Sequence, residues 1–241
     1  MQEYKDFAKA AEDLPNFGCT FREITSNFTF FFKKYLINPL TVCRTMKKRD
    51  NLNFALFVGF IHIISSVLLF LGFCLNCGFL LKQLYSGTIY IPVLQSILFG
   101  ILFTVLTCVC FFAMTYIVSL SKDTSKPRAT ETLSVFCTNT IGLSCFYIVC
   151  FATSFLSFYL SLLIFLFAFF YFGIICTIGI EALTETMIFG KQTFATSCIV
   201  SAMLACLLFV FVAFLYATYS FFTVDGAYIT DIFYIIIRYL K

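Results

Sequence analysis

The sequence predicts an all-α fold: a polytopic membrane protein with a five-helix transmembrane bundle and N-terminal amphipathic, interfacial helices. The main observation is that the 49 residues 132–180 include no Asp, Glu, Lys, Arg or His. As one helix this run would be roughly 73 Å long, more than twice a hydrocarbon core of about 30 Å, so we expect it to cross a membrane twice. Composition agrees, because 61% of the residues are hydrophobic and only 12% are charged.

Five apolar segments are long enough to span a bilayer. They are approximately Phe54–Leu80, Ile91–Leu120, Leu133–Thr153, Phe158–Ile180 and Ala195–Phe222. The third and fourth divide near residues 154–157, although neither Pro nor Gly marks a turn there. We therefore expect one bundle (54–222), a cytosolic or interfacial region before it (1–53), and a short interfacial tail (223–241) whose apolar run is too short to cross.

The region before the first span predicts two helices at the membrane surface. Thr20 and Glu23 have the spacing of a capping box at the start of a helix. A line of apolar residues with helical spacing follows: Phe21, Ile24, Phe28, Phe31, Phe32 and Tyr35. We expect this amphipathic helix to lie in the headgroup layer of the membrane. Asn38 and Pro39 then predict the N-cap and the first residue of another short helix.

The distribution of Lys and Arg predicts the orientation in the membrane. If the N-terminus is cytosolic, 13 of the 16 basic residues lie on the cytosolic side, and only Lys82, Arg238 and Lys241 lie outside. The positive-inside rule therefore predicts a cytosolic N-terminus and an outside C-terminus. The basic residues before the first span suit anionic lipid headgroups better than nucleic acid. The candidates for contact with the membrane surface are Lys33, Lys34, Lys47, Lys48 and Arg49.

Few strongly polar side chains fall within the spans, and each is a candidate for function. His62 is the one histidine; alone it cannot build a metal site or a catalytic triad, and we expect it to hydrogen-bond a serine or backbone group of a neighbouring helix. Asn139 lies within the third span. Glu181 and Glu185 share one face at the cytosolic end of the fourth span. They form either a pair that binds a cation or relays protons, or two solvated acids at a helix end near Lys191.

The cysteines do not predict an enzyme. Most of the 12 cysteines lie in apolar runs, where a thiol packs as a small hydrophobic group. Cys74 and Cys77 form a C-x-x-C motif at the outer end of the first span, and the sequence leaves open whether they form a disulfide. Membrane thiol oxidases generally need a second cysteine pair on the same side, and the outer loops contain none. We expect no enzymatic activity, no bound metal and no cofactor.

Small residues four positions apart predict close contacts between helices. The pairs are Ser157/Ser161, Gly173/Thr177, Ser201/Ala205 and Ala213/Ala217. Such pairs let helix backbones approach each other, either within one bundle or between the copies of a homo-oligomer.

Three segments carry a family pattern. A turn at Asn38–Cys43 precedes the first span; Ala129, Thr132, Leu133 and Val135 open the third span; and a polar connection, GIEALTETMIFGKQTFATSCIVSAML, joins the last two spans. Together they resemble the Yip family (Ypt/Rab-interacting proteins), most closely its bacterial branch, over roughly residues 30–222. The resemblance implies five spans with a cytosolic N-terminus. It also implies a bacterial cytoplasmic membrane, with an ER or Golgi membrane as the alternative.

Two hypotheses for function follow. The resemblance implies a non-enzymatic membrane adaptor or organiser, whose cytosolic N-terminal region and 121–132 loop face a protein partner or lipid headgroups. The competing hypothesis is a small transporter or channel subunit with His62, Asn139, Glu181 and Glu185 along its path. Transporters usually have paired broken helices and polar groups near the midplane, and the third and fourth spans lack both. A polar cavity that reaches the bilayer centre would favour the transporter.

Overall fold

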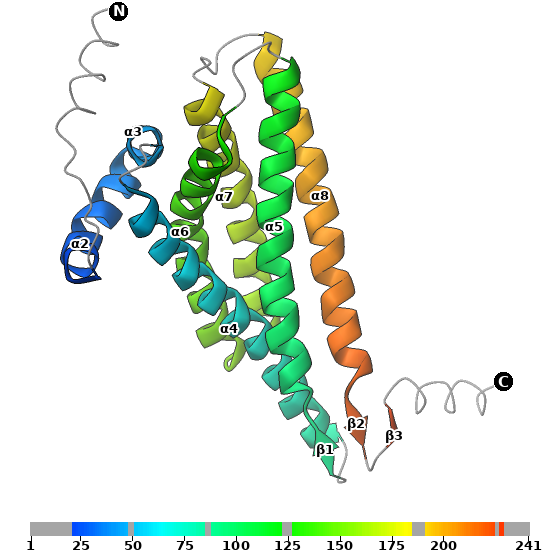
Figure 1. Cartoon of the computed structure of the whole chain (residues 1–241). Helices are drawn as coiled ribbons and strands as arrows, with labels where there is room; N and C mark the ends of the chain where they lie inside the picture. Colours follow the sequence, from blue (N-terminus) through cyan, green and yellow to red (C-terminus); the bar gives the residue numbers. More distant parts are fainter. Residues whose placement is uncertain are drawn as a thin grey trace, which may run out of the picture.

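The computed structural model describes residues 21–47, 51–84, 88–121, 127–184, 191–224 and 227–228. The described helices are α2 (Phe21–Ile37), α3 (Pro39–Met46), α4 (Leu52–Leu84), α5 (Val93–Ser121), α6 (Ala129–Ser154), α7 (Phe158–Thr184) and α8 (Lys191–Ser220) (Figure 1). Two short helices therefore precede five long ones, which confirms the predicted fold class.

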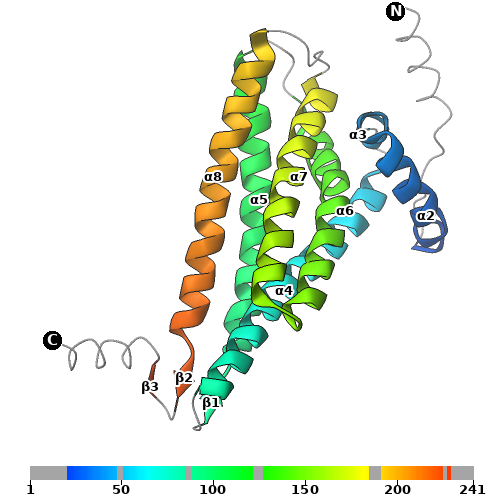
Figure 2. The ribbon, with the colours of Figure 1, turned by 180° about the vertical axis from the view of Figure 1, so that it is seen from behind.

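Among the described helices, α4–α8 are the five that are long and apolar enough to cross a membrane, so the chain is an integral membrane protein. Successive helices of the bundle run in opposite directions (Figures 1 and 2). As a result, α2 and α3 lie at the end of the bundle where α4 begins, and the ends of α4 and α8 lie together at the other. The predicted spans agree with these helices to within a few residues at each end.

The turn between α6 and α7 lies where the sequence predicted it. Leu156 and Ser157 both donate their backbone N–H groups to the carbonyl of Thr153, over 3.0 and 2.9 Å, and so close the end of α6. The hydroxyl of Ser161 donates to the carbonyl of Cys150 over 2.7 Å. A buried side chain of α7 thus ties the two helices together beside the turn, where no Pro or Gly is needed.

A small antiparallel sheet closes the end of the bundle opposite α2 and α3. Its strands are β1 (Ile89–Tyr90), β2 (Thr223–Val224) and β3 (Ala227–Tyr228), in the order β1-β2-β3. Ile89 pairs with Val224, and Tyr90 pairs with Thr223. Strands of two residues are too short to show a two-residue periodicity, so the sequence did not predict them. The sheet joins the connection between α4 and α5 to the chain that leaves α8.

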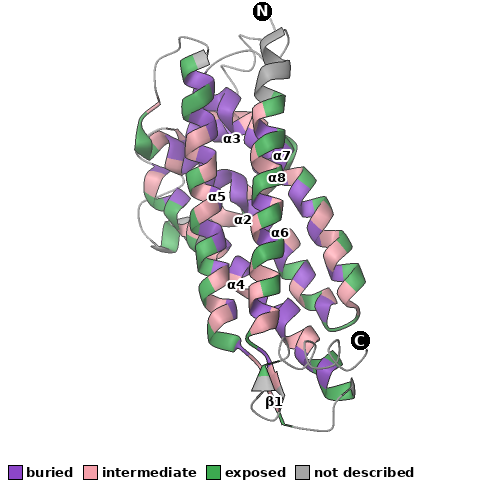
Figure 3. Cartoon of the chain, turned by 90° about the vertical axis from the view of Figure 1, so that its right-hand side faces the viewer, coloured by how far each residue is buried: buried purple, intermediate pink, exposed green. Residues whose placement is uncertain are grey.

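The core is organised around α6, which packs most extensively against α4 and α7. Within its apolar segment 67% of the residues are buried, against 17% in the apolar segment of α8. Figure 3 shows the exposed and half-buried residues along α5 and α8 on one side of the molecule. Since the medium around the spans is lipid, these apolar faces are in an environment that matches them.

A cluster of phenylalanine rings joins four of the spans. Phe211 of α8 stacks on Phe165 of α7, with ring centroids 3.8 Å apart. Its ring also lies 5.4 Å from that of Phe70 on α4 and 5.7 Å from that of Phe103 on α5. Each aromatic pair contributes about 0.5–1.5 kcal/mol beyond the burial of its area. This cluster holds α8 to the bundle although most of the helix is peripheral.

Many of the buried hydroxyl groups in the spans are satisfied by their own helix. Thr138 donates to the carbonyl of Ser134 over 2.8 Å, and Thr115 donates to that of Phe111 over the same distance. Bonds of this kind satisfy a hydroxyl group where no water is available. The polar residues of α6 and α5 are therefore compatible with a dry interior.

Candidate functional site

The start of α3 is fixed as the sequence predicted. The side chain of Asn38 accepts a hydrogen bond from the backbone N–H of Thr41 over 3.2 Å, and Pro39 occupies the first helical position. Proline is well suited to this position because its ring fixes φ and the missing N–H has no partner within the helix anyway. This cap sets the direction of α3 and brings Cys43 into the interior of the bundle, where it is fully buried.

The apolar face of α2 packs against the protein. The ring of Phe31 lies 4.7 Å from that of Phe54, and the ring of Phe28 lies 6.1 Å from that of Phe57, both on α4. Phe31 and Tyr35 are buried. The expectation that this face lies in the headgroup layer is therefore wrong for these residues, because the start of α4 offers an aromatic surface that covers them. Thr20, and the side chains of Phe21 and Ile24, lie outside the described part of the chain.

Asn139 of α6 connects three other helices. Its amide nitrogen donates to the carbonyl of Ile175 on α7 over 3.2 Å, and its side-chain oxygen accepts from the thiol of Cys43 on α3 over 3.0 Å. Its backbone carbonyl accepts from the hydroxyl of Tyr35 on α2 over 3.3 Å. We call Tyr35, Cys43 and Asn139 the asparagine cluster. All three residues are buried, so the cluster anchors α2 and α3 to the bundle.

The asparagine cluster is neutral. Burial raises the pKa of Tyr35 well above its ordinary range, and the neighbouring Cys43 and Tyr171 raise it further. Burial also raises the pKa of Cys43 to about 12. A neutral thiol and a neutral phenol are hydrogen-bond donors, which is the role that Asn139 requires of them. The arrangement is suited to holding helices together; it holds neither a nucleophile nor a general base.

We expect the thiol of Cys43 to resist iodoacetamide in the folded protein at about pH 8, because alkylation needs the thiolate. The raised pKa of the Cys43 thiol in the folded protein favours its protonated form at neutral pH. The stability that this thiol contributes is therefore present at neutral pH and is lost as the pH rises towards about 12. Mass spectrometry of the Cys43 peptide before and after denaturation in SDS checks this. Equal rates of alkylation in both states would contradict it.

His62 has the structural role that the sequence suggested. Its Nδ1 lies 3.1 Å from the hydroxyl oxygen of Ser144 on α6, and that hydroxyl donates to the carbonyl of Thr140 over 2.7 Å. Because the single proton of Ser144 is used in this way, Nδ1 of His62 carries a hydrogen and donates to Ser144. The imidazole also stacks on Tyr147, with ring centroids 5.6 Å apart. Its partners differ from those of Asn139, so the two residues do not form one site.

The acidic residues of α7 fall at the same end of the bundle as α3. Glu181 is only 9% exposed, so the expectation of a solvated acid at the helix end is wrong for this residue. Helix α3 packs against α7, and Lys47, directly after α3, reaches the carbonyl of Leu183 two residues beyond Glu181. Glu185 and the side chain of Lys191 lie outside the described part of the chain, and the predicted pairing of the two acids is not described.

The basic residues divide into two groups. Lys33 and Lys34 are exposed on α2, and the ammonium group of Lys34 lies 5.6 Å from the centre of the Phe30 ring. Lys47 instead turns inward and donates to the carbonyl of Leu183 over 3.4 Å. A cation is favourable there because the last carbonyls of a helix carry partial negative charge. Lys48 and Arg49 lie outside the described residues.

A second apolar surface on α2 was missed by the periodicity argument. Leu36 and Ile37 are 62% and 71% exposed at the end of the helix, and Phe30 is 41% exposed. Together with Lys33 and Lys34 they form what we call the outer face of α2. The signal was present in the sequence, because α2 has apolar residues on more than one side, but nothing local indicated which side the bundle would cover.

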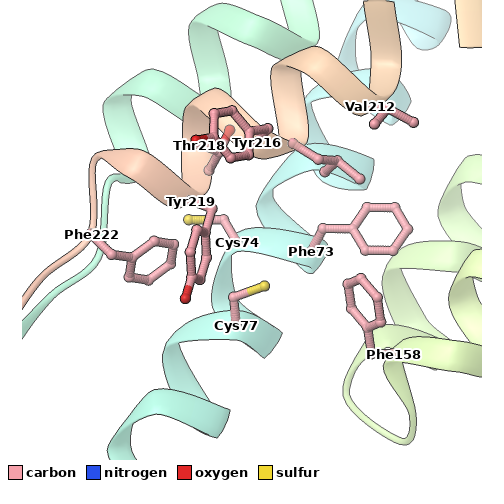
Figure 4. A pocket seen from close by; sticks show the side chains of 10 residues that line it. Phe73, Cys74, Cys77, Phe158, Val212, Tyr216, Thr218, Tyr219 and Phe222 are labelled. Atoms are coloured by element: carbon pink, nitrogen blue, oxygen red, sulfur yellow. The ribbon is translucent and has the colours of Figure 1, made fainter. Parts of the chain in front are cut away.

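Cys74 and Cys77 lie far from the asparagine cluster, at the end of the bundle that carries the sheet. Both are free thiols. They line a pocket of about 290 Å³ between α4, the start of α7 and the end of α8. Figure 4 shows both cysteines on α4, opposite Tyr219 and Phe222. The sheet end of the bundle thus combines the C-x-x-C motif with an aromatic pocket, and the two thiols are not joined to each other.

Within the described residues, no three side chains of His, Cys, Asp or Glu lie close enough together to hold a metal ion. Those of the predicted polar candidates that the structure describes lie in three places: the asparagine cluster, the His62–Ser144 contact and the buried Glu181. Comparison with protein-family models, with curated proteins and with solved structures gave no match to this chain.

Proposed function

We propose that the chain is a non-enzymatic, Yip-like membrane adaptor or organiser with a cytosolic N-terminus, which acts through its N-terminal helices and the 121–132 loop. The observation that carries the proposal is that α2 has two different sides. One side is anchored to the bundle, and the other is exposed and combines lysines with apolar residues.

The anchored side supports the presentation of a fixed surface. Tyr35 and Cys43 reach Asn139, and Lys47 reaches the end of α7. Interhelical hydrogen bonds in membranes contribute on average about 0.6 kcal/mol and up to about 2 kcal/mol each. Several of them, together with the Phe31–Phe54 contact, favour one orientation of α2 and α3. A partner would therefore meet a preorganised surface and would not have to order it.

The chemistry of the exposed side fits a membrane surface with a protein partner close by. Leu36 and Ile37 can insert their side chains among lipid chains, and Lys33 and Lys34 can stay near anionic headgroups. Each basic residue near an anionic surface contributes about 1 kcal/mol. Phe30 extends the apolar part of this surface. The outer face of α2 is thus suited to a partner that is itself membrane-bound.

The described ends of the 121–132 segment, the end of α5 and the start of α6, lie at the same end of the bundle as α2 and α3 (Figure 1). In its described part the backbone N–H of Arg128 donates to the carboxylate of Glu131 over 3.2 Å, which caps α6. The cap leaves Arg128 and Thr130 exposed. We propose that these residues form the second part of the surface that a partner would contact.

The hydrogen bonding of the spans favours this proposal over the transporter. A permeation path needs polar side chains that are free to contact a solute, but Thr138 donates to its own helix and Ser144 is used by His62 and Thr140. The asparagine of the cluster is likewise engaged by its neighbours. The transporter remains a hypothesis that would need His62 and Glu181 to face a water-filled path.

The test is photo-crosslinking in native membranes from a photoreactive phenylalanine analogue at Leu36. We expect a discrete protein adduct there beside lipid adducts, because the outer face of α2 meets a membrane-bound partner, and we expect the protein adduct to be lost in the Lys33→Glu, Lys34→Glu double variant. The control position is Tyr159, which is exposed at the opposite end of the bundle and should give lipid adducts. If Leu36 also gives lipid adducts alone, the adaptor proposal is wrong.

A further inference from the structure

Aromatic residues make up half of the side chains that line the pocket beside Cys74 and Cys77. Phe73 of α4 and Phe158 at the start of α7 contact each other edge to face, with centroids 5.4 Å apart, and form one wall. Tyr219 and Phe222 form the floor, with centroids 6.4 Å apart. Phe222 is fully buried, and the strand that follows it holds this part of the chain in place. These ring contacts connect the walls of the pocket to the packed end of the bundle.

The lining has little to offer a polar ligand. The hydroxyl of Thr218 donates to the carbonyl of Phe214 over 2.9 Å, and the thiol of Cys74 lies 3.8 Å from the carbonyl of Pro92, to which it donates. No charged side chain is among the residues that line the pocket. The remaining polar groups of the lining are the thiol of Cys77 and the hydroxyls of Tyr216 and Tyr219. Because the rest of the lining is uncharged hydrocarbon, the pocket favours an apolar occupant over a polar one, which would lose hydrogen bonds here.

The pocket opens towards the lipid. Val212 and Tyr216 line it, and they are 56% and 68% exposed on α8 within its membrane-spanning segment. An apolar chain can therefore enter sideways from the bilayer without passing through water. The volume of about 290 Å³ is at the lower limit of the roughly 300–1,000 Å³ typical of small-molecule sites. This is enough for part of one hydrocarbon chain and too little for the body of a two-chain lipid.

We propose that this pocket is a binding site for one acyl chain of a membrane phospholipid. The headgroup stays in the interfacial layer at the sheet end of the bundle, where the hydroxyl-bearing rings of Tyr216 and Tyr219 are suited to the boundary between water and hydrocarbon. The site lies at the end of the molecule opposite the outer face of α2, so it is independent of the proposed adaptor function.

Binding at this site depends on shape. A chain that moves from the bilayer into the pocket exchanges one apolar environment for another, so the hydrophobic effect contributes little and van der Waals contact with the rings decides retention. A single bulky side chain placed in the pocket should therefore displace the chain. Cys77→Phe does this from α4, and Leu215→Trp does it from α8. Cys206→Phe makes the same chemical change as Cys77→Phe on an exposed part of α8 outside the pocket.

The experiment uses the full chain in phosphatidylcholine vesicles that contain a phosphatidylcholine with a diazirine near the end of one acyl chain. After irradiation, peptide mapping should find adducts concentrated in residues 73–77 and 212–219. These adducts should fall about tenfold in Cys77→Phe and in Leu215→Trp, the effect of about 1.4 kcal/mol of lost contact. They should be unchanged in Cys206→Phe.

Resistance of Cys43 to alkylation shows that a variant is folded, because Cys43 is buried in the folded protein. Cys43 lies at the end of the bundle opposite the pocket, so the substituted side chains do not contact it. If a folded pocket variant keeps the wild-type adducts, or if adducts are spread evenly along α8, the lipid is only part of the annulus and the proposal is overturned. Since two variants fill the pocket from different helices, failure of one of them to fold leaves the other to decide.

Discussion

Replacement of Gly100 by alanine is expected to produce the largest loss of stability among single methyl additions to the bundle. A Cβ at this position would lie 2.6 Å from Cα and 2.9 Å from the backbone nitrogen of Val67 on α4. The hydroxyl of Ser66 also donates to the carbonyl of Gly100 over 2.9 Å. Because the obstacle is backbone, α4 and α5 must separate and that bond must lengthen. We expect a loss of about 3 kcal/mol in the free energy of unfolding, at the upper end of overpacking effects.

SDS titration of the detergent-solubilised protein measures this loss. Gly78→Ala is the matched control on α4, because its Cβ would meet the end of the Ile91 side chain at 2.8 Å, which can move away. We expect the control to cost less than about 1.5 kcal/mol. Equal effects of the two substitutions would mean that α4 and α5 do not make backbone contact at Gly100.

Gly179→Ala is expected to break the asparagine cluster from the side of α7. A methyl group at Gly179 would overlap with the amide nitrogen of Asn139 and would lie 3.1 Å from the ring of Phe111 and 3.2 Å from Val135. Asn139 cannot keep both its bond to α7 and its bond to Cys43 once it moves. We expect a loss of about 2–3 kcal/mol, and rapid alkylation of Cys43 as α3 loosens.

A double-mutant cycle with Asn139→Ala separates the clash from a general effect of the added methyl group. Asn139→Ala alone removes the hydrogen bonds of the side-chain amide. In the double variant the amide is also absent, so the methyl group at residue 179 no longer clashes with it. We therefore expect the two losses to be less than additive, by about 1–2 kcal/mol. Additive losses would show that Gly179 and Asn139 are not in contact.

Much of the fold could be predicted because lipid imposes strong local constraints. The uncharged run 132–180 required two helices, and the structure divides it at Phe155 and Leu156. Asn38 and Pro39 form a helix start that depends only on residues close by in the sequence, so it too was predictable. The burial of Glu181 was not, because a glutamate at the end of a helix is ordinarily exposed.

The asparagine cluster could not be predicted because its contacts join distant parts of the chain. Tyr35 and Cys43 precede Asn139 by 104 and 96 residues, and a cysteine in an apolar segment is ordinarily a small hydrophobic residue. The spacing of small residues predicted the close contacts between helices only in part. Gly173 lies against Leu204 of α8, as close packing requires, but Ser201 and Ala205 are exposed. The close contact at Gly100, which has Ser96 and Thr104 four residues away on either side, was not among the predicted pairs.

The most direct test of the central claim, an odd number of crossings with α2 and α3 on the cytosolic side, is labelling from each side of the membrane. Thr130→Cys and Tyr228→Cys introduce thiols at exposed positions at opposite ends of the bundle. With an impermeant maleimide and mass spectrometry of the labelled peptides, we expect Tyr228→Cys to react in intact cells and Thr130→Cys to react only after permeabilisation. Reaction of both from the same side would contradict the five-span topology, and the reverse pattern would contradict the cytosolic placement of α2 and α3.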